Sequence, residues 1–305
     1  MTGGGKLAVS LGALVALCVP SIARAQTIWD IARQPGLRNI RHDVAAEQFF
    51  VDMASGEPER ARLLVARVRY ERLLERAPDD PDVLQGLADV LSHSGPEHLL
   101  RARALVLRAR EVAVDVSQES SALFLLGIVE TRRHDFAAAV EAYRALLRMR
   151  SGAGRRGSAL CNLAESYLTL RQLEPAIENY LACTEVLPQE AMGFWGLASA
   201  YDRDSRLPEA RRAAAQAVDL DPHFDDAEFD GGLSGPTNFF EPPYELHYYV
   251  ALGLEAAGRP ADALARWQRY LDEGGRAGPW AARAQHHIEA LVPGAPVQAR
   301  SRRPR

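Results

Sequence analysis

One pattern of residues occurs twice in this chain, and the two copies are 34 residues apart at every position. The first copy consists of Leu160, Leu163, Ala164, Tyr167, Ala176, Tyr180 and Pro188, and the second of Phe194, Leu197, Ala198, Tyr201, Ala210, Ala214 and Pro222. Apolar residues three or four apart predict the buried face of a helix, and the proline predicts where the second helix ends. Small residues on both helices allow close approach, so the pattern predicts a repeated pair of antiparallel helices.

This period and these residue types resemble the tetratricopeptide repeat. The resemblance implies an all-α fold, a right-handed superhelical solenoid of antiparallel helix pairs. Weaker copies around Ala88, Gly127 and Ala251 extend it over residues 44–291, and residues 279–291 are expected to form a C-terminal capping helix. Because the family provides interaction scaffolds, the resemblance implies a protein or peptide partner, no catalytic activity and no cofactor.

The spacing of the small residues predicts one insertion. The interval from Ala198 to Ala251 exceeds 34 residues by 19, and the excess falls at residues 223–243. Long loops within compact arrays are often functional. The loop contains Phe239 and Phe240, and we expect at least one of these rings to dock near Trp195 or Tyr248 as a lid. The alternative is a flexible surface loop.

In such a solenoid the first helices of successive repeats line a concave groove, which is where the family resemblance implies that a partner binds. The residues three and two positions before each small residue are expected to point into it. The predicted partner-binding residues are Gln85, Phe124, Leu125, Asn162, Trp195, Tyr248 and Tyr249. Large aromatic side chains often anchor interfaces. The alternative is that some of them pack between repeats or beneath the insertion. A clamp for a terminal carboxylate is not expected, because Lys6 is the only lysine in the chain.

The two ends of the chain have other compositions. Lys6, the apolar residues 7–19 and the sequence Ala23-Arg24-Ala25 are typical of a secretory signal peptide cleaved after Ala25, which predicts a periplasmic or extracellular protein. The apolar run is too short to span a membrane, and no later stretch is apolar enough to do so. Residues 26–43 are predicted to be an N-terminal extension, and 292–305 a disordered basic tail.

The mature chain keeps two cysteines, Cys161 and Cys183. If Ala164 lies level with Ala176, Cys161 lies level with Asn179, and Cys183 is four residues further along its helix. That offset amounts to about 6 Å along the axis. Since disulfides need close and converging side chains, we predict two free thiols, with Cys183 buried.

Composition and spacing argue against several other functions. Cleavage of the signal would remove two cations and move the net charge from −4 to about −6, which does not favour nucleic-acid binding. His286 and His287 are adjacent on a predicted helix, so they are expected to be surface residues rather than joint metal ligands. We therefore expect no metal site. Two alternatives to groove binding remain: a structural subunit of an envelope or secretion complex that uses its convex face, and a metal-binding or enzymatic role for the acidic insertion.

Overall fold

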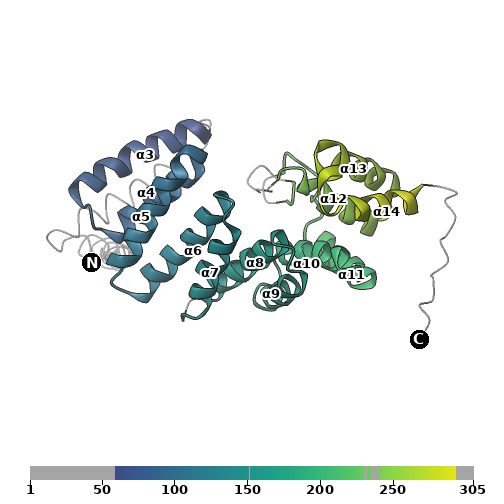
Figure 1. Cartoon of the computed structure of the whole chain (residues 1–305), viewed down its shortest axis with the longest axis horizontal. Helices are drawn as coiled ribbons and strands as arrows, with labels where there is room; N and C mark the ends of the chain where they lie inside the picture. Colours follow the sequence, from purple (N-terminus) through teal and green to yellow (C-terminus); the bar gives the residue numbers. More distant parts are fainter. Residues whose placement is uncertain (1–58, 151, 230–231, 235–239, 241, 293–305) are drawn as a thin grey trace, which may run out of the picture. The chain divides into compact units, whose positions relative to one another are not determined.

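A computed structural model describes residues 59–150, 152–229, 232–234, 240 and 242–292. Within these residues the chain is all-helical and contains no strand, which confirms the predicted fold class (Figure 1). The predicted signal peptide, the N-terminal extension, the start of the predicted array (residues 44–58) and residues 293–305 of the predicted tail lie outside the described residues. The described helices and their bounds are α3 (Glu59–Arg76), α4 (Pro81–His93), η1 (Pro96–His98), α5 (Leu99–Val112), α6 (Val116–Arg132), α7 (Phe136–Leu147), α8 (Ala153–Thr169), α9 (Leu173–Val186), α10 (Ala191–Arg203), α11 (Leu207–Leu220), α12 (Glu245–Ala256), α13 (Pro260–Glu273), η2 (Gly275–Ala277) and α14 (Ala281–Leu291).

The prolines that were predicted to stop helices lie just beyond helix ends. Pro188 and Pro222 each follow the last residue of their helix by two positions, and Pro78 does the same after α3. Proline also begins helices, where its missing N–H costs nothing, as at Pro81 and Pro260. The positions of proline therefore explain where these helices begin and end.

The turns inside four helix pairs share one backbone geometry. In each turn a backbone N–H donates to the carbonyl five residues earlier; the four bonds are Asp135 to Glu130, Gln172 to Tyr167, Arg206 to Tyr201 and Arg259 to Leu254. The residue before each donor has a positive φ: His134, Arg171, Ser205 and Gly258. This is the Schellman ending of a helix, and it folds the second helix back along the first. The repeat thus extends to hydrogen bonds that the side-chain pattern did not reveal.

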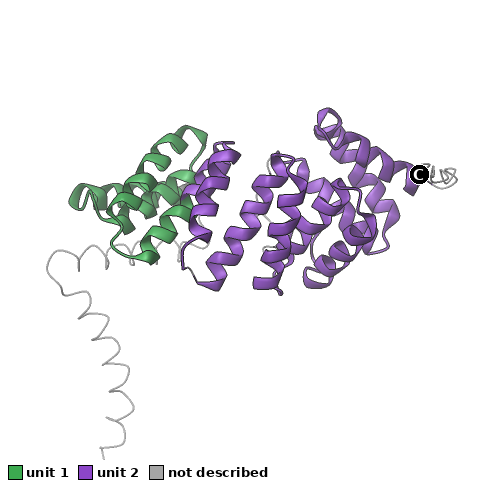
Figure 2. Ribbon diagram, turned by 60° about the horizontal axis from the view of Figure 1, so that its bottom comes forward, with its two compact units in different colours: residues 1–125 green, residues 126–305 purple. Residues whose placement is uncertain are grey.

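The described helices divide into two compact units, one up to Leu125 and the other from Leu126 (Figure 2). In the first unit, α4 packs against α3 and α5 through side chains such as Tyr70, Leu84 and Leu87. In the second unit, α8 packs on α9, α10 on α11 and α12 on α13, while α8 and α12 also contact α10. The first helices of three successive pairs, α8, α10 and α12, therefore lie side by side.

The insertion packs on the second unit. Phe224 and Leu233 are fully buried, and the Phe224 ring lies 5.3 Å from the Trp195 ring, centroid to centroid. Asp221 Oδ2 accepts hydrogen bonds from Trp195 Nε1 at 3.4 Å and from the Leu233 N–H at 2.8 Å. The insertion thus covers the position at which Trp195 would have faced a groove. Trp195 is 0% exposed, so its prediction as a partner-binding residue is wrong and the alternative of packing beneath the insertion holds.

Tyr248 is also a core residue, which corrects a second groove prediction. Its ring contacts Trp267 and Tyr270 edge to face, and its hydroxyl donates to Asp202 Oδ2 at 2.6 Å. Arg203 also lies over the ring, and Tyr248 is fully buried, so no surface of Tyr248 is left for a partner. Leu125 is likewise buried.

His287 is not a surface residue, contrary to its prediction, whereas His286 is exposed. The His287 imidazole stacks on Trp267 with ring centroids 4.4 Å apart and bridges Asp202 and Glu255 at 3.0 and 2.8 Å. Burial alone lowers the pKa of His287, but hydrogen bonds to the two carboxylates outweigh burial and raise it to about 9. The capping helix α14 is therefore attached to α10 and α12 through a buried cation.

Candidate functional site

A hollow of about 550 Å³ opens between α8, α10 and α12, and it is the candidate binding site of the second unit. Its lining residues come from these three helices, from α9 and the turn that follows it, and from the insertion. The lining residues are Gly154, Ser158, Cys161, Asn162, Glu165, Tyr180, Leu187, Glu190, Met192, Gly196, Phe240 and Tyr249. A volume of this size is within the range of ligand pockets, about 300–1,000 Å³.

One repeat has a glycine in the hollow at a position where the neighbouring repeats have larger side chains. Asn162, Gly196 and Tyr249 each lie two positions before the small residue of their repeat. Gly196 also permits the close approach of Tyr180, since a Cβ on it would lie 2.1 Å from Tyr180 Cε1. The missing side chain at Gly196 therefore lets the Tyr180 ring lie against α10, where it lines the hollow.

Glu165 lies at the centre of the polar contacts in the hollow. Its carboxylate accepts hydrogen bonds from the hydroxyl groups of Tyr180 and Tyr249, which come from α9 and α12. The side chain is exposed on the side of the hollow. Desolvation by the surrounding protein raises the pKa of Glu165, and the two hydroxyl groups and the charge of Arg203 oppose that rise. Burial and the nearby carboxylate raise the pKa of both tyrosines, so both remain donors at neutral pH.

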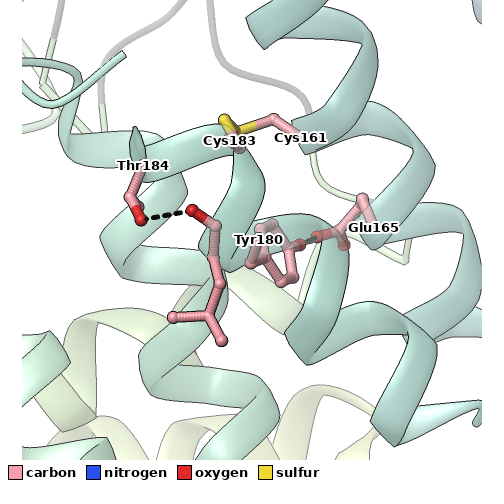
Figure 3. Close-up of a disulfide and its surroundings, with 6 residues drawn as sticks. Cys161, Glu165, Tyr180, Cys183 and Thr184 are labelled. Carbon is pink, nitrogen blue, oxygen red and sulfur yellow. Dashed lines mark hydrogen bonds between the residues drawn. A yellow bond between two sulfur atoms is a disulfide. The ribbon is translucent and has the colours of Figure 1, made fainter. Parts of the chain in front are cut away.

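A disulfide joins Cys161 to Cys183 beside the hollow, so the prediction of two free thiols is wrong (Figure 3). The Cα atoms are 5.4 Å apart. Helix α8 ends at Thr169 and α9 begins at Leu173, so the turn centres on residue 171. Cys161 lies ten residues before that centre and Cys183 twelve residues after it, which leaves an offset of only about 3 Å.

The direction of the side chains brings the two sulfur atoms together. Each Cβ leans toward the N-terminus of its own helix, so the two leans are opposed in an antiparallel pair and close the remaining offset. Cys183 is fully buried, as predicted. Gly193 of α10 packs against the bond, because a Cβ at that position would lie 3.4 and 3.5 Å from the two sulfur atoms. The disulfide thus supports the wall of the hollow.

The hollow contains three of the predicted site residues: Asn162, Tyr249 and Phe240. The Phe240 ring lies 5.3 Å from that of Tyr249, so it docks on α12 next to Tyr248 rather than on Tyr248 itself. Phe239 lies outside the described residues. Gln85, whose amide donates to the Gln118 carbonyl at 3.3 Å, and Phe124 are partly buried residues of the first unit.

Sequence reasoning missed Glu165, Tyr180, Met192 and Gly196 as lining residues. Glu165 follows Ala164 directly, and Gly196 lies two positions before Ala198, so the repeat numbering could have identified both. Two acidic residues of the insertion have structural roles: Asp225 pairs with Arg259 at 2.8 Å, and Asp226 accepts a hydrogen bond from the Glu228 N–H. Within the described residues, no cluster of three or more His, Cys, Asp or Glu side chains is placed to hold a metal ion.

Comparisons with known proteins agree with this geometry. A family model of the tetratricopeptide repeat matches residues 97–154 and 161–223. The chain contains tetratricopeptide repeats. No curated protein matches the sequence. Among solved structures, PilF of Pseudomonas aeruginosa is similar with a TM-score of 0.54 and 14% identity, covering 80% of this chain and 97% of its own.

A tetratricopeptide repeat protein from Parabacteroides merdae has a TM-score of 0.51 and 14% identity, and the match covers 83% of this chain and 92% of that one. At such identities these structures show the fold alone. Among the described helices of this repeat protein, none is long and apolar enough to cross a membrane. Solenoids built from such repeats present extended concave surfaces for binding.

Proposed function

We propose that this repeat protein is an exported, non-catalytic scaffold that binds an extended peptide or a helix of a partner protein along α8, α10 and α12. The observation that carries the proposal is the hollow around Gly196. It is a concave surface on the first helices of three successive repeats, and it combines apolar side chains with exposed polar groups.

The hollow suits a side chain of a partner better than it suits bulk water. Leu187, Met192, Phe240 and the rings of Tyr180 and Tyr249 supply apolar surface. Met192 is 43% exposed, although a methionine gains free energy by being buried. A partner residue that filled the hollow would cover this surface, and Phe240 would then form one wall against it.

Export is supported by two independent features. The N-terminal residues have the composition of a cleavable secretory signal. The Cys161–Cys183 disulfide belongs to a class of bond that persists in oxidising compartments such as the periplasm or the extracellular space.

A site-specific photo-crosslinker tests the proposed surface. We would place p-benzoyl-phenylalanine at Met192, irradiate the native host and identify the crosslinked peptide by mass spectrometry. Leu181 on α9 is the matched control, because it is also 43% exposed but does not line the hollow. We expect one discrete polypeptide adduct at position 192 and none at 181.

The adduct should also depend on the chemistry of the hollow. In a second strain with the crosslinker at Ser158, Met192→Ser should reduce the adduct, whereas Leu181→Ser should not. Equal adducts at 192 and 181, or an adduct unaffected by Met192→Ser, would contradict the proposal and favour use of another face.

A further inference from the structure

The charged side chains that line the hollow are both carboxylates. Glu165 and Glu190 both lie on its surface, and no arginine, lysine or histidine is among the described residues that line it. Arg155 and Arg156 follow Gly154 in the chain but do not line the hollow, and Arg156 donates to the Leu147 carbonyl. The hollow therefore combines an apolar wall with two negative charges.

Unlike Glu245 and Asp202 of the same unit, these two carboxylates form no ion pair with an arginine within the described residues. Glu245 pairs with Arg203, and Asp202 pairs with Arg283 at 2.6 Å. In contrast, the hydrogen bonds of the Glu165 carboxylate come from two neutral hydroxyl groups, and within the described residues Glu190 forms no ion pair. Arg203 acts on Glu165 through its charge without forming an ion pair with it, so a cation supplied from outside the fold would be the first to pair directly with either carboxylate.

The chain itself shows how an arginine fits such an environment. The Arg203 guanidinium pairs with Glu245 and lies over the rings of Tyr248 and Trp280, 4.5 and 5.1 Å from their centroids. Stacking on an aromatic face together with a carboxylate contact is a favourable arrangement for a guanidinium. The hollow offers the same groups, the Glu165 carboxylate and the rings of Tyr249 and Phe240, without the arginine.

We propose that the hollow is a recognition site for an arginine side chain of the partner polypeptide, flanked by an apolar residue. This inference rests on the proposed function and names the partner's chemistry. The guanidinium contacts Glu165 and Glu190, and the neighbouring apolar residue contacts Leu187 and Met192. Arginine suits the site better than lysine, because its planar group can both stack and bind a carboxylate through two N–H groups. A terminal carboxylate would be repelled.

The test uses the full chain and two labelled peptides, Gly-Ser-Leu-Arg-Leu-Ser-Gly and the same peptide with citrulline in place of arginine. Citrulline keeps the shape and loses the charge. Fluorescence anisotropy should show at least about tenfold tighter binding of the arginine peptide, since a hydrogen bond to a charged group is worth that much or more. Added salt should weaken binding of the arginine peptide more than that of the citrulline peptide.

Three glutamine variants test whether the preference for arginine depends on the carboxylates that line the hollow. Glu165→Gln and Glu190→Gln should each reduce the preference for arginine over citrulline. Glu178→Gln should leave it unchanged, because Glu178 is exposed on α9 and does not line the hollow. Glu165→Gln retains a carbonyl oxygen for the two tyrosine hydroxyl groups, and Glu190→Gln changes an exposed residue, so at least one variant is expected to fold normally.

Equal affinity for the two peptides in the unsubstituted protein would overturn the inference. Tighter binding of arginine that appears only after removal of residues 293–305 would also overturn it, because the tail's own arginines would then be the natural occupant. Either result leaves the crosslinking test of the proposed function intact. If that test identifies a partner segment without arginine, groove binding stands and arginine recognition fails.

Discussion

Four equivalent turn residues have left-handed backbone conformations, and three of them are not glycine. His134, Arg171 and Ser205 have φ values of 60°, 61° and 63°, while Gly258 has φ of 71°. An L-residue in this region experiences a steric penalty of about 1–2 kcal/mol, because its Cβ approaches the following carbonyl oxygen. Substitution by glycine would remove this penalty. Part of the resulting stabilisation would be lost, because glycine has more conformational freedom in the unfolded chain.

Ser205→Gly should therefore stabilise the protein by about 0.5–1 kcal/mol. The reverse change at the equivalent position, Gly258→Ala, should destabilise it by about 1 kcal/mol, because open space around Gly258 leaves backbone strain as the main effect. Urea denaturation would measure both differences. A destabilising Ser205→Gly substitution would show that the serine side chain, and not the backbone, determines this turn.

His287 makes stability depend on pH in a predictable direction. Its pKa is about 9 in the folded protein and near 6.5 in an unfolded chain. The folded state therefore retains the proton more strongly, and the stabilisation is fully present below pH 6.5 and lost as the pH rises through 9. Burial alone would raise the pKa of Asp202, but His287 and Arg283 hold it below its usual range, so Asp202 remains the anionic partner throughout this window.

The free energy of unfolding should fall between pH 6.5 and pH 9.5 by up to about 3 kcal/mol because of His287 alone. His287→Gln should flatten this part of the profile, whereas His286→Gln, which changes the exposed neighbour, should leave the slope unchanged. Chemical denaturation at a series of pH values gives the profile. Identical slopes in the two variants would contradict the assignment of the buried cation to His287.

At the scale of helices, sequence periodicity predicted the helices of the repeated pairs but not the contacts made by the insertion. Ala164 and Ala198 located two first helices, and Pro188 and Pro222 located the ends of the second helices, because these features arise from contacts within one helix pair. Trp195 was misplaced because Phe224 and Leu233, which cover it, lie in the insertion and follow no period. Sequence spacing cannot show which helix surface such a segment covers.

The burial of His287 also could not be predicted from the repeat pattern. Its partners Asp202 and Glu255 belong to α10 and α12, and Asp202 is 85 residues away in the chain. Periodicity places a residue on a face of its own helix but does not identify the distant side chain that meets that face. The hollow could be predicted in part. Gly196 occupies a repeat position, and its side chain is smaller than those of Asn162 and Tyr249 at the equivalent positions, but the pattern does not show which residues line the hollow.

The Cys161–Cys183 bond links α8 to α9 and closes a loop with a sequence separation of 22 residues. A loop of this length stabilises the folded state by about 3 kcal/mol in the chain-entropy model. Dithiothreitol should lower the free energy of unfolding by about that amount. It should have no such effect on a Cys161→Ala, Cys183→Ala double variant, whose stability should match that of the reduced protein.

Thiol counting gives a second measure of the same bond. Denatured, non-reduced mature protein should contain no free thiol, because the remaining cysteine, Cys18, lies in the predicted signal peptide. Two reactive thiols per chain would show that the bond is absent in solution. The wall of the hollow at Cys161 would then be free to repack.

At the scale of the whole molecule, the disulfide and the composition of the N-terminal residues both fit an oxidising compartment outside the cytoplasm. The bond needs an oxidising compartment to persist. The acidic hollow, in turn, would meet an arginine-bearing partner in that compartment. The N-terminal signal would deliver the chain there, so export is the condition on which the other proposals depend.

Cleavage after Ala25 is the prediction that tests export directly. Protein recovered from the native host's envelope or medium should begin at Gln26, because Ala23 and Ala25 supply the small residues that a signal peptidase recognises. Ala25→Asp should block cleavage and leave a longer precursor, whereas Gln26→Ser, on the other side of the cleavage position, should be processed normally. Intact-mass spectrometry and N-terminal sequencing distinguish the two forms. A protein that keeps Met1 and remains in the cytoplasm would contradict export, and its cysteines should then be found reduced.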